Sequence, residues 1–166
     1  MSDWTQARPE VIAIGVVLAL GVAIIGGLLT ESGPWHDSLR MPAWRPPTWM
    51  FGPAWTVIFA FIAASGIVAW LRANDDATRA WLVALLAING ALNIAWSGIF
   101  FRLRRPDWAF VELLLLWLSI LALVVLTARV STTAGWLMSP YLAWVTFAGA
   151  LNLRIVQLNG PFKARA

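Results

Sequence analysis

Long apolar runs separated by short polar segments dominate this chain of 166 residues. Each run has roughly 20 residues, which at about 1.5 Å of helical rise per residue crosses a hydrocarbon core of roughly 30 Å. The runs lack the strict alternation of apolar and polar residues that a β-barrel requires. The pattern predicts an all-α membrane protein, a five-transmembrane-helix bundle in one membrane domain over residues 1–166, with helices at 11–30, 49–71, 80–101, 108–128 and 135–156.

The connection between the first two runs, residues 31–48, is the only long one. Loops of this length between short ones usually serve as lids or binding loops when they are not disordered. Its four prolines restrict the backbone, and its tryptophans argue against disorder. We therefore expect this Pro/Trp-rich first loop to act as a lid.

The composition favours ligand binding over thiol or acid–base chemistry. Cysteine is absent, which excludes disulfides, thiolate metal sites and cysteine nucleophiles. A single histidine and a single tyrosine leave little means for acid–base catalysis. The 12 tryptophans suit membrane–water interfaces, but they are more than a chain of this length needs. The surplus indicates a ligand that makes aromatic contacts.

Basic residues are divided unevenly between the two sides of the predicted membrane. The side with the first loop, the third loop and the carboxyl tail has the larger share, so the positive-inside rule places the lid loop and the carboxyl terminus in the cytoplasm, in our expectation of a bacterial cell. Anionic lipid headgroups suffice to explain the net charge of +4, and no nucleic acid partner is expected. The eight basic residues on one side and four on the other are Arg40, Arg45, Arg102, Arg104, Arg105, Arg154, Lys163 and Arg165, against Arg8, Arg72, Arg79 and Arg129.

Two charged residues interrupt the later runs. Glu112 lies about one turn into the fourth predicted helix, where an acidic residue suits the helix amino end, so we expect it near the membrane interface. Arg154 lies near the end of the fifth helix and is expected to extend its guanidinium toward the headgroups.

The third predicted helix has two different faces. At about 100° per residue, one stripe of amides and aromatics falls within roughly 60°, and such polar residues in a span usually face the bundle interior. The opposite strip contains only small residues, which let two helices approach closely, so it suits either a partner subunit or packing inside the bundle. The stripe is Asn89, Asn93, Trp96 and Phe100, and the strip is Ala84, Ala87, Ala91, Ala95 and Gly98.

Two further helices offer matching aromatic faces. Trp55 and Phe59 share a face of the second helix, and Trp144, Ala148 and Asn152 share a face of the fifth. Flat aromatic walls with a few hydrogen-bonding groups predict a pocket for a large planar apolar ligand. The first helix has a small-residue ridge, which we expect to serve helix packing rather than ligand contact: Gly15, Ala19, Ala23 and Gly27.

Taken together, these motifs resemble those of the TspO/translocator-protein family, also called tryptophan-rich sensory proteins or peripheral-type benzodiazepine receptors. The resemblance covers essentially the whole chain in the right order, and it is specific as a set although each motif alone is weak. The motifs are Trp35-x-x-x-Leu39-x-x-Pro42-x-Trp44-x-Pro46-Pro47, Phe51-x-x-x-Trp55, Asn93-x-x-Trp96-Ser97-x-x-Phe100-Phe101, Pro140-Tyr141-Leu142-x-Trp144 and Leu151-Asn152.

The resemblance implies a membrane protein, commonly a homodimer, that binds porphyrins such as protoporphyrin IX and haem. It also implies binding of synthetic isoquinolines and, in some members, cholesterol. The porphyrin is a ligand, and no obligatory cofactor is implied. By the resemblance, the pocket lies under the first loop with Trp44 and Pro47 in the lid, and it is lined by Trp55, Phe59, Asn93, Trp96, Trp144 and Ala148.

The chain departs from the family pattern at two places. His36 stands where many members have tyrosine; it could ligate haem iron through a neutral imidazole nitrogen, or simply bond to the loop backbone at the interface. Leu153 and Gln157 stand where the animal cholesterol-recognition motif has tyrosine and arginine, which lowers the expectation of sterol binding.

Three functions follow as hypotheses. The first is a receptor or sensor that binds a tetrapyrrole between Trp55, Phe59, Trp96 and Trp144, with a hydrogen bond from Asn93. The second, suggested by the resemblance alone, is an enzyme that breaks down bound protoporphyrin in light. The third is a tetrapyrrole or sterol transporter, which is disfavoured because the sequence shows no repeat and no buried charge pair for ion coupling.

Overall fold

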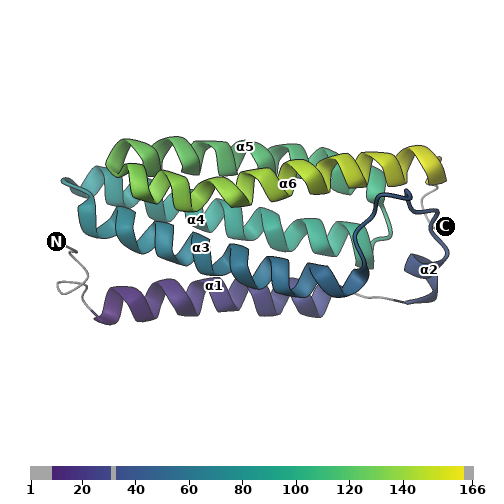
Figure 1. The fold of residues 1–166 in the computed structure, drawn as a ribbon, viewed down its shortest axis with the longest axis horizontal. Coiled ribbons are helices and arrows are strands. Elements are labelled where there is room, and N and C mark those ends of the chain that lie inside the picture. The colour runs from purple at the N-terminus through teal and green to yellow at the C-terminus, as the bar shows by residue number, and fades with distance from the viewer. Residues whose placement is uncertain (1–8, 31–32, 163–166) are drawn as a thin grey trace.

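The computed structural model describes residues 9–30 and 33–162, and it is helical throughout, without a strand in these ranges. Figure 1 shows the long helices lying side by side along one axis. Short elements interrupt the connections: α2 (Pro34–Asp37), the 3-10 helix η2 (Thr48–Met50) and the π-helix η3 (Gly98–Arg102). The long helices are α1 (Pro9–Leu29), α3 (Phe51–Arg72), α4 (Asp76–Ser97), α5 (Pro106–Val130) and α6 (Thr132–Asn159).

Four helical segments among the described residues are long and apolar enough to cross a membrane, so this is a multi-pass integral membrane protein. The 28 residues of α6 are not among the four. Its sequence contains polar and weakly apolar residues that face the protein interior, including Tyr141 and Asn152, and these lower its mean hydropathy. The four segments are Pro9–Leu29, Thr48–Arg72, Asp76–Arg102 and Pro106–Val130.

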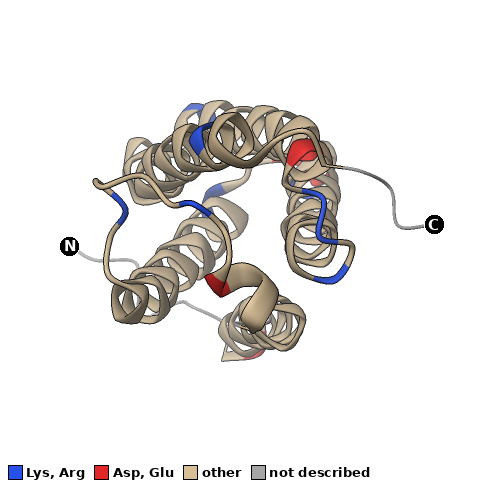
Figure 2. Cartoon of the chain, turned by 90° about the vertical axis from the view of Figure 1, so that its right-hand side faces the viewer, with Lys and Arg blue, Asp and Glu red and all other residues tan. Residues whose placement is uncertain are grey.

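The long helices form a ring in the order α1, α3, α6, α5, α4, in which each helix packs against the next and α4 returns to α1. The end-on view in Figure 2 shows this ring. Helix α1 is the least embedded member, because Gly26 is its only buried residue and most of its large apolar side chains are exposed. The best-packed pair is α5 and α6, where Gly149 lets the helices approach so closely that a Cβ there would lie 3.0 Å from the Leu113 side chain.

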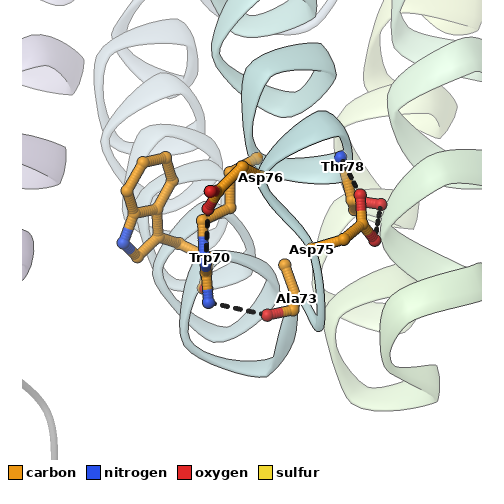
Figure 3. Close-up of polar contacts among 6 residues, drawn as sticks. Trp70, Ala73, Asp75, Asp76 and Thr78 are labelled. Atoms are coloured by element: carbon orange, nitrogen blue, oxygen red, sulfur yellow. Dashed lines mark hydrogen bonds and ion pairs between the residues drawn. The ribbon is translucent and has the colours of Figure 1, made fainter.

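Helix α4 begins at Asp76, four residues before the predicted start at 80, because Asp75 caps it. One carboxylate oxygen of Asp75 accepts from the Thr78 amide at 2.7 Å, and the other accepts from the Thr78 hydroxyl at 2.7 Å. Arg79 closes the end of α3 by donating to the Ala73 carbonyl at 2.7 Å. Figure 3 shows both groups of contacts in the turn between α3 and α4. The predicted polar loop 72–79 is therefore only a short turn.

The end of the third predicted helix changes its winding. The α-helix stops at Ser97 and continues as the π-helix η3, where the Leu103 amide donates to the Gly98 carbonyl at 3.0 Å. The chain then turns sharply at Arg104, whose φ of 55° lies in the left-handed region. Arg105 follows, and its guanidinium donates to Asp107 at 2.6 Å as α5 begins.

The predicted lid loop is partly helical, since α2 and η2 lie within or beside residues 33–50, and residues 31–32 fall outside the described residues. The loop is fastened to the end of α6 by two reciprocal bonds. The Arg40 amide donates to Asn159 Oδ1 at 2.8 Å, and Asn159 Nδ2 donates to the Arg40 carbonyl at 2.9 Å. The first connection and the carboxyl end of α6 therefore lie at the same end of the bundle.

Glu112 lies within the first two turns of α5, and its side chain is enclosed by the bundle. It is buried, with 9% of its surface exposed, and neither carboxylate oxygen has a hydrogen-bond partner among the described residues. Its position near the start of α5 suggested an interfacial residue, and the side chain lies on the helix side that carries Ser119 and faces the interior. Arg154, in contrast, is exposed as expected and donates to Gln157 Oε1 at 3.0 Å.

Candidate functional site: an aromatic cavity

A cavity of about 860 Å³ lies inside the ring, bounded mainly by α1, α3, α4 and α6 and by the first connection. This volume is within the range of roughly 300–1,000 Å³ that is typical of small-molecule sites. Six of the eight predicted pocket residues line it: Trp55, Phe59, Asn93, Trp96, Trp144 and Ala148.

One aromatic cluster comes from α3 and α6. The rings of Trp55 and Phe59 stack with centroids 5.4 Å apart, as their i, i+4 spacing predicts. Trp144 of α6 meets Trp55 edge-on at 6.4 Å and Phe51 at 5.8 Å. Phe51 also lines the cavity, although the sequence analysis placed it only in a motif. These contacts hold several rings in fixed orientations along one part of the wall.

A second aromatic cluster comes from α4, η3 and α2. Trp96 stacks on Phe100 at 5.1 Å and meets Phe101 at 6.0 Å, and Phe101 in turn lies 5.7 Å from the His36 ring. Trp35 meets Phe100 edge-on at 6.1 Å. The π-helix brings both Phe100 and Phe101 to the cavity, whereas α-helical spacing predicted only Phe100 on the stripe.

Small residues create the open space between these rings. Ala19, Ala23 and Gly27 of α1 line the cavity, so most of the ridge that was assigned to helix packing faces the cavity instead. Gly15 does serve packing, because a Cβ built there would lie 3.1 Å from the Ile67 side chain of α3. Short side chains from α3, among them Ala60 and Ala64, continue the same wall.

A buried polar network lies beside the cavity and joins α4, α5 and α6. Asn93 Nδ2 donates to the Tyr141 hydroxyl at 3.1 Å, and that hydroxyl donates to Asn89 Oδ1 at 3.2 Å. Asn89 Nδ2 donates to the Ser119 hydroxyl at 2.9 Å. Asn93 reaches the cavity wall, whereas Asn89, predicted on the same stripe, does not line the cavity. The amide nitrogen of Asn93, predicted to serve a ligand, thus bonds to the protein.

The indole of Trp96 is held in place by α6. Its Nε1 donates to Asn152 Oδ1 at 3.1 Å, and Asn152 Nδ2 donates to the Pro106 carbonyl at 2.8 Å. Asn152 is 1% exposed, so it has no access to water that would replace these bonds. Trp96 therefore presents its ring, not its N–H group, to the cavity.

The lid residues divide into two groups. His36, Arg45 and Thr48 line the cavity at the end covered by the first connection. Trp44 and Pro47 do not line it: Trp44 is 50% exposed and packs edge-on against Phe147 at 5.7 Å, and Pro47 is exposed just before η2. The first connection therefore covers the cavity as expected, but the residues that face the cavity are His36, Arg45 and Thr48 instead of Trp44 and Pro47.

His36 is mostly buried beside the cavity. Its Nδ1 makes no hydrogen bond within the described residues and lies 3.5 Å from a carboxylate oxygen of Asp37. Bonding of this nitrogen to the loop backbone, which was one of the two expectations, is therefore not observed.

The small-residue strip of α4 lies outside the cavity. Its three residues toward the start of the helix are exposed, and its two later residues are half-buried. The half-buried end is close to α1, since a Cβ built on Gly98 would lie 3.9 Å from the Leu29 side chain. The exposed residues are Ala84, Ala87 and Ala91, and the half-buried ones are Ala95 and Gly98.

Comparison with known proteins places the chain among sequence relatives that match most of its length. The chain is 37% identical over 153 residues to the tryptophan-rich protein TspO of Chlorobaculum tepidum, with 89% of this chain and 94% of that protein covered. It is 37% identical over 133 residues to protein CrtK of Rhodobacter capsulatus, covering 80% and 83% of the two chains. It is 36% identical over 161 residues to the translocator protein of Ovis aries, covering 93% and 94%. The family model described as TspO/MBR matches residues 13–158, and the chain belongs to this family.

Proposed function

We propose that the protein is a membrane receptor or sensor that binds a planar tetrapyrrole, such as protoporphyrin IX or haem, in the aromatic cavity. The observation that carries the proposal is the arrangement of fixed aromatic rings around one space. Trp55, Trp96 and Trp144 all line the cavity, and each is held by a neighbouring ring or by a hydrogen bond. A flat, largely apolar macrocycle stacks on such rings and loses water-exposed apolar area, at roughly 25 cal/mol per Å² before the cost of ordering the lid.

The experiment that tests the proposal is a titration of the detergent-purified protein with protoporphyrin IX in the dark, followed by tryptophan fluorescence. Because three indoles lie at the cavity, bound porphyrin should quench the emission in a saturable manner at low micromolar ligand. The control is a micelle solution with an indole-bearing peptide at the same tryptophan concentration. Quenching that stays linear, as in the control, would show partition into detergent and would reject the pocket.

The three indoles also support a second candidate function, light-driven breakdown of the bound porphyrin. An indole in contact with an excited macrocycle is an oxidisable group, and the cavity places several within reach. Turnover would be measured as loss of porphyrin absorbance in light with a defined product and more than one equivalent consumed per protein. Loss limited to less than one equivalent would indicate bleaching.

His36 is the proposed iron ligand when the tetrapyrrole is haem. Its position on the cavity wall and the missing hydrogen bond at Nδ1 support this role. Since metal-free protoporphyrin has no iron to ligate, replacement of His36 by alanine should change the haem spectrum and affinity while leaving protoporphyrin binding intact.

The topology proposal is a fifth span formed by α6, with the lid and the carboxyl end in the cytoplasm. The 28 residues of α6 are longer than a span requires and lie in the ring between α3 and α5. More basic residues lie at the lid end, viewed face-on in Figure 2, and Arg8, Lys163 and Arg165 fall outside the described residues. Fusion of a cytoplasm-dependent fluorescent protein to the carboxyl end should give signal, and fusion of alkaline phosphatase should not. Among the described residues, the basic residues at the lid end are Arg40, Arg45, Arg102, Arg104, Arg105 and Arg154, and those at the opposite end are Arg72, Arg79 and Arg129.

The proposed partner, beside the ligand and membrane lipid, is a second copy of the chain. The exposed strip of Ala84, Ala87 and Ala91 on α4 supports a homodimer, because small residues let two helices pack closely in lipid.

A further inference from the structure

The cavity has one fully charged group. Of the described residues that line it, Arg45 alone belongs to the Asp, Glu, Lys and Arg types, and the other lining groups are apolar or neutral apart from His36. A guanidinium at an otherwise apolar site is costly unless a partner offsets its partial loss of water. Arg45 is half-buried, so an anionic group of a ligand in the cavity would offset this cost.

Arg45 is held at the cavity by local bonds. Its amide donates to the Pro42 carbonyl at 3.0 Å, which closes a turn, and its Nη2 donates to the Thr48 hydroxyl at 3.0 Å. No carboxylate pairs with it in the part of the chain that the structure describes. A guanidinium has five N–H donors, so the bond to Thr48 leaves a fork that matches the geometry of a carboxylate.

The residues around Arg45 indicate what kind of ligand would carry such a carboxylate. Thr48 begins the helical segment that also carries Phe51 and Trp55, and all three line the cavity with Arg45. A ligand that matches both the aromatic rings and the Arg45 guanidinium has a flat apolar body against the rings and an anionic group at the edge nearest the lid. Metal-free or metallated porphyrins with free propionate groups have this shape.

We infer that Arg45 is the specificity-determining residue of the cavity and that it receives a carboxylate of the ligand, so that the site prefers an acidic tetrapyrrole to the neutral ester of the same macrocycle. This inference rests on the proposed function. A charge-assisted bond to a carboxylate in a partly water-excluded site corresponds to roughly a tenfold or larger gain in affinity.

The test compares protoporphyrin IX with its dimethyl ester, both titrated in the dark against the same detergent-solubilised protein. The ester keeps the macrocycle and removes the charge. The variants are Arg45→Gln, which removes the guanidinium charge, Arg45→Lys, which keeps a charge without the fork, and Arg40→Gln as the matched control. Arg40 lies in the same connection and contributes only its backbone to the bonds with Asn159, and it does not line the cavity.

The quantity measured is the ratio of acid affinity to ester affinity, normalised to the ratio in wild type, because this cancels the different partition of the two ligands into micelles. We expect Arg45→Gln to lower the ratio about tenfold, with ester affinity within about threefold of wild type, which also shows that the variant is folded. Arg45→Lys should give an intermediate ratio, and Arg40→Gln the wild-type ratio. Should Arg45→Gln fail to fold, a ratio lowered in Arg45→Lys alone carries the same conclusion.

Two results would overturn the inference, and they differ from each other. Saturable binding of both ligands with the wild-type ratio in the Arg45 variants would reject the role of Arg45 and leave the proposed function standing. Failure of both ligands to bind wild type saturably would reject the proposed function, and this inference with it.

Discussion

The indole Nε1 of Trp96 and the side-chain oxygen of Asn152 are joined by a hydrogen bond of 3.1 Å, which fixes a cavity-lining ring of α4 to α6. The same asparagine donates to the Pro106 carbonyl at 2.8 Å, at the first residue of α5. One amide therefore connects three helices beside the lid end of the cavity, and the orientation of the Trp96 ring depends on a residue that presents little surface of its own.

Replacement of Asn152 by alanine should destabilise the protein by about 1–3 kcal/mol, because the Trp96 N–H group and the Pro106 carbonyl would both lose their buried partner. Thermal unfolding in detergent measures the change. The matched control is Asn74→Ala, an exposed asparagine in the turn between α3 and α4, which should leave the transition unchanged. Equal unfolding temperatures for both variants would contradict the role assigned to this bond.

Replacement of Trp144 by alanine should lower protoporphyrin affinity roughly tenfold, or about 1.4 kcal/mol, through lost ring contact and burial. Titration in the dark measures the affinity, and sedimentation measures the oligomeric state, which should not change. The control is Trp136→Ala on the same helix, since Trp136 is 73% exposed and does not line the cavity. If both variants bind as wild type does, Trp144 does not contact the ligand.

Replacement of Ala91 by leucine should weaken the proposed homodimer while keeping protoporphyrin affinity within about threefold. The added side chain would prevent close approach of two α4 helices, and it points away from the cavity. Crosslinking and sedimentation over a range of protein-to-detergent ratios measure the dimer. Ala143→Leu, an equivalent change at an exposed position of α6, is the control. A dimer of undiminished strength would place the interface elsewhere.

The Asp75 cap predicts a pH dependence at the start of α4. The hydrogen bond from the Thr78 amide, followed by that from the Thr78 hydroxyl, lowers the pKa of the Asp75 carboxyl below its ordinary value of about 3.9. A lowered pKa in the folded state means that the contribution to stability is present above the ordinary value and disappears as the pH falls through the folded-state pKa. Asp75→Ala should therefore lower the unfolding temperature at pH 7, and the difference from wild type should shrink below about pH 4.

The control for this pH experiment is Asp76→Ala. The Asp76 side chain pairs with Arg79 at 3.0 Å but does not cap the helix. A gap between wild type and Asp75→Ala that stays constant through acidification would show that the ionised carboxylate is not what stabilises the turn.

The sequence predicted the helical segments and six cavity-lining residues because both depend on local properties. Apolar length determines where helices form, and the i, i+4 spacing determines which side chains share a face, as for Trp55 and Phe59. Helical spacing does not predict which other helix or cavity a given face contacts. Asn89 and Asn93 lie on one face of α4 and both bond to the Tyr141 hydroxyl, yet only Asn93 reaches the cavity, and Asn89 bonds also to Ser119 of α5.

The remaining differences come from the tertiary arrangement. Glu112 occupies a position near a helix start where exposure is normal, and only the packing of the ring buries it. The α1 alanines at 19 and 23 have the spacing of a packing ridge, but they line the cavity that the large rings also line. Arg45 looked like one of several basic loop residues, and its relation to the cavity depends on the fold of the connection.

The π-helix at Gly98–Arg102 makes the aromatic wall sensitive to the number of residues as well as to their identity. A π-turn accommodates one more residue than an α-turn, and this extra residue allows both Phe100 and Phe101 to reach the cavity. Deletion of one residue from this segment should restore ordinary α-helical winding, in which Phe100 and Phe101 would point about 100° apart. Substitution of either phenylalanine would test its side chain, whereas a change in chain length would test the winding that brings both side chains to the same cavity.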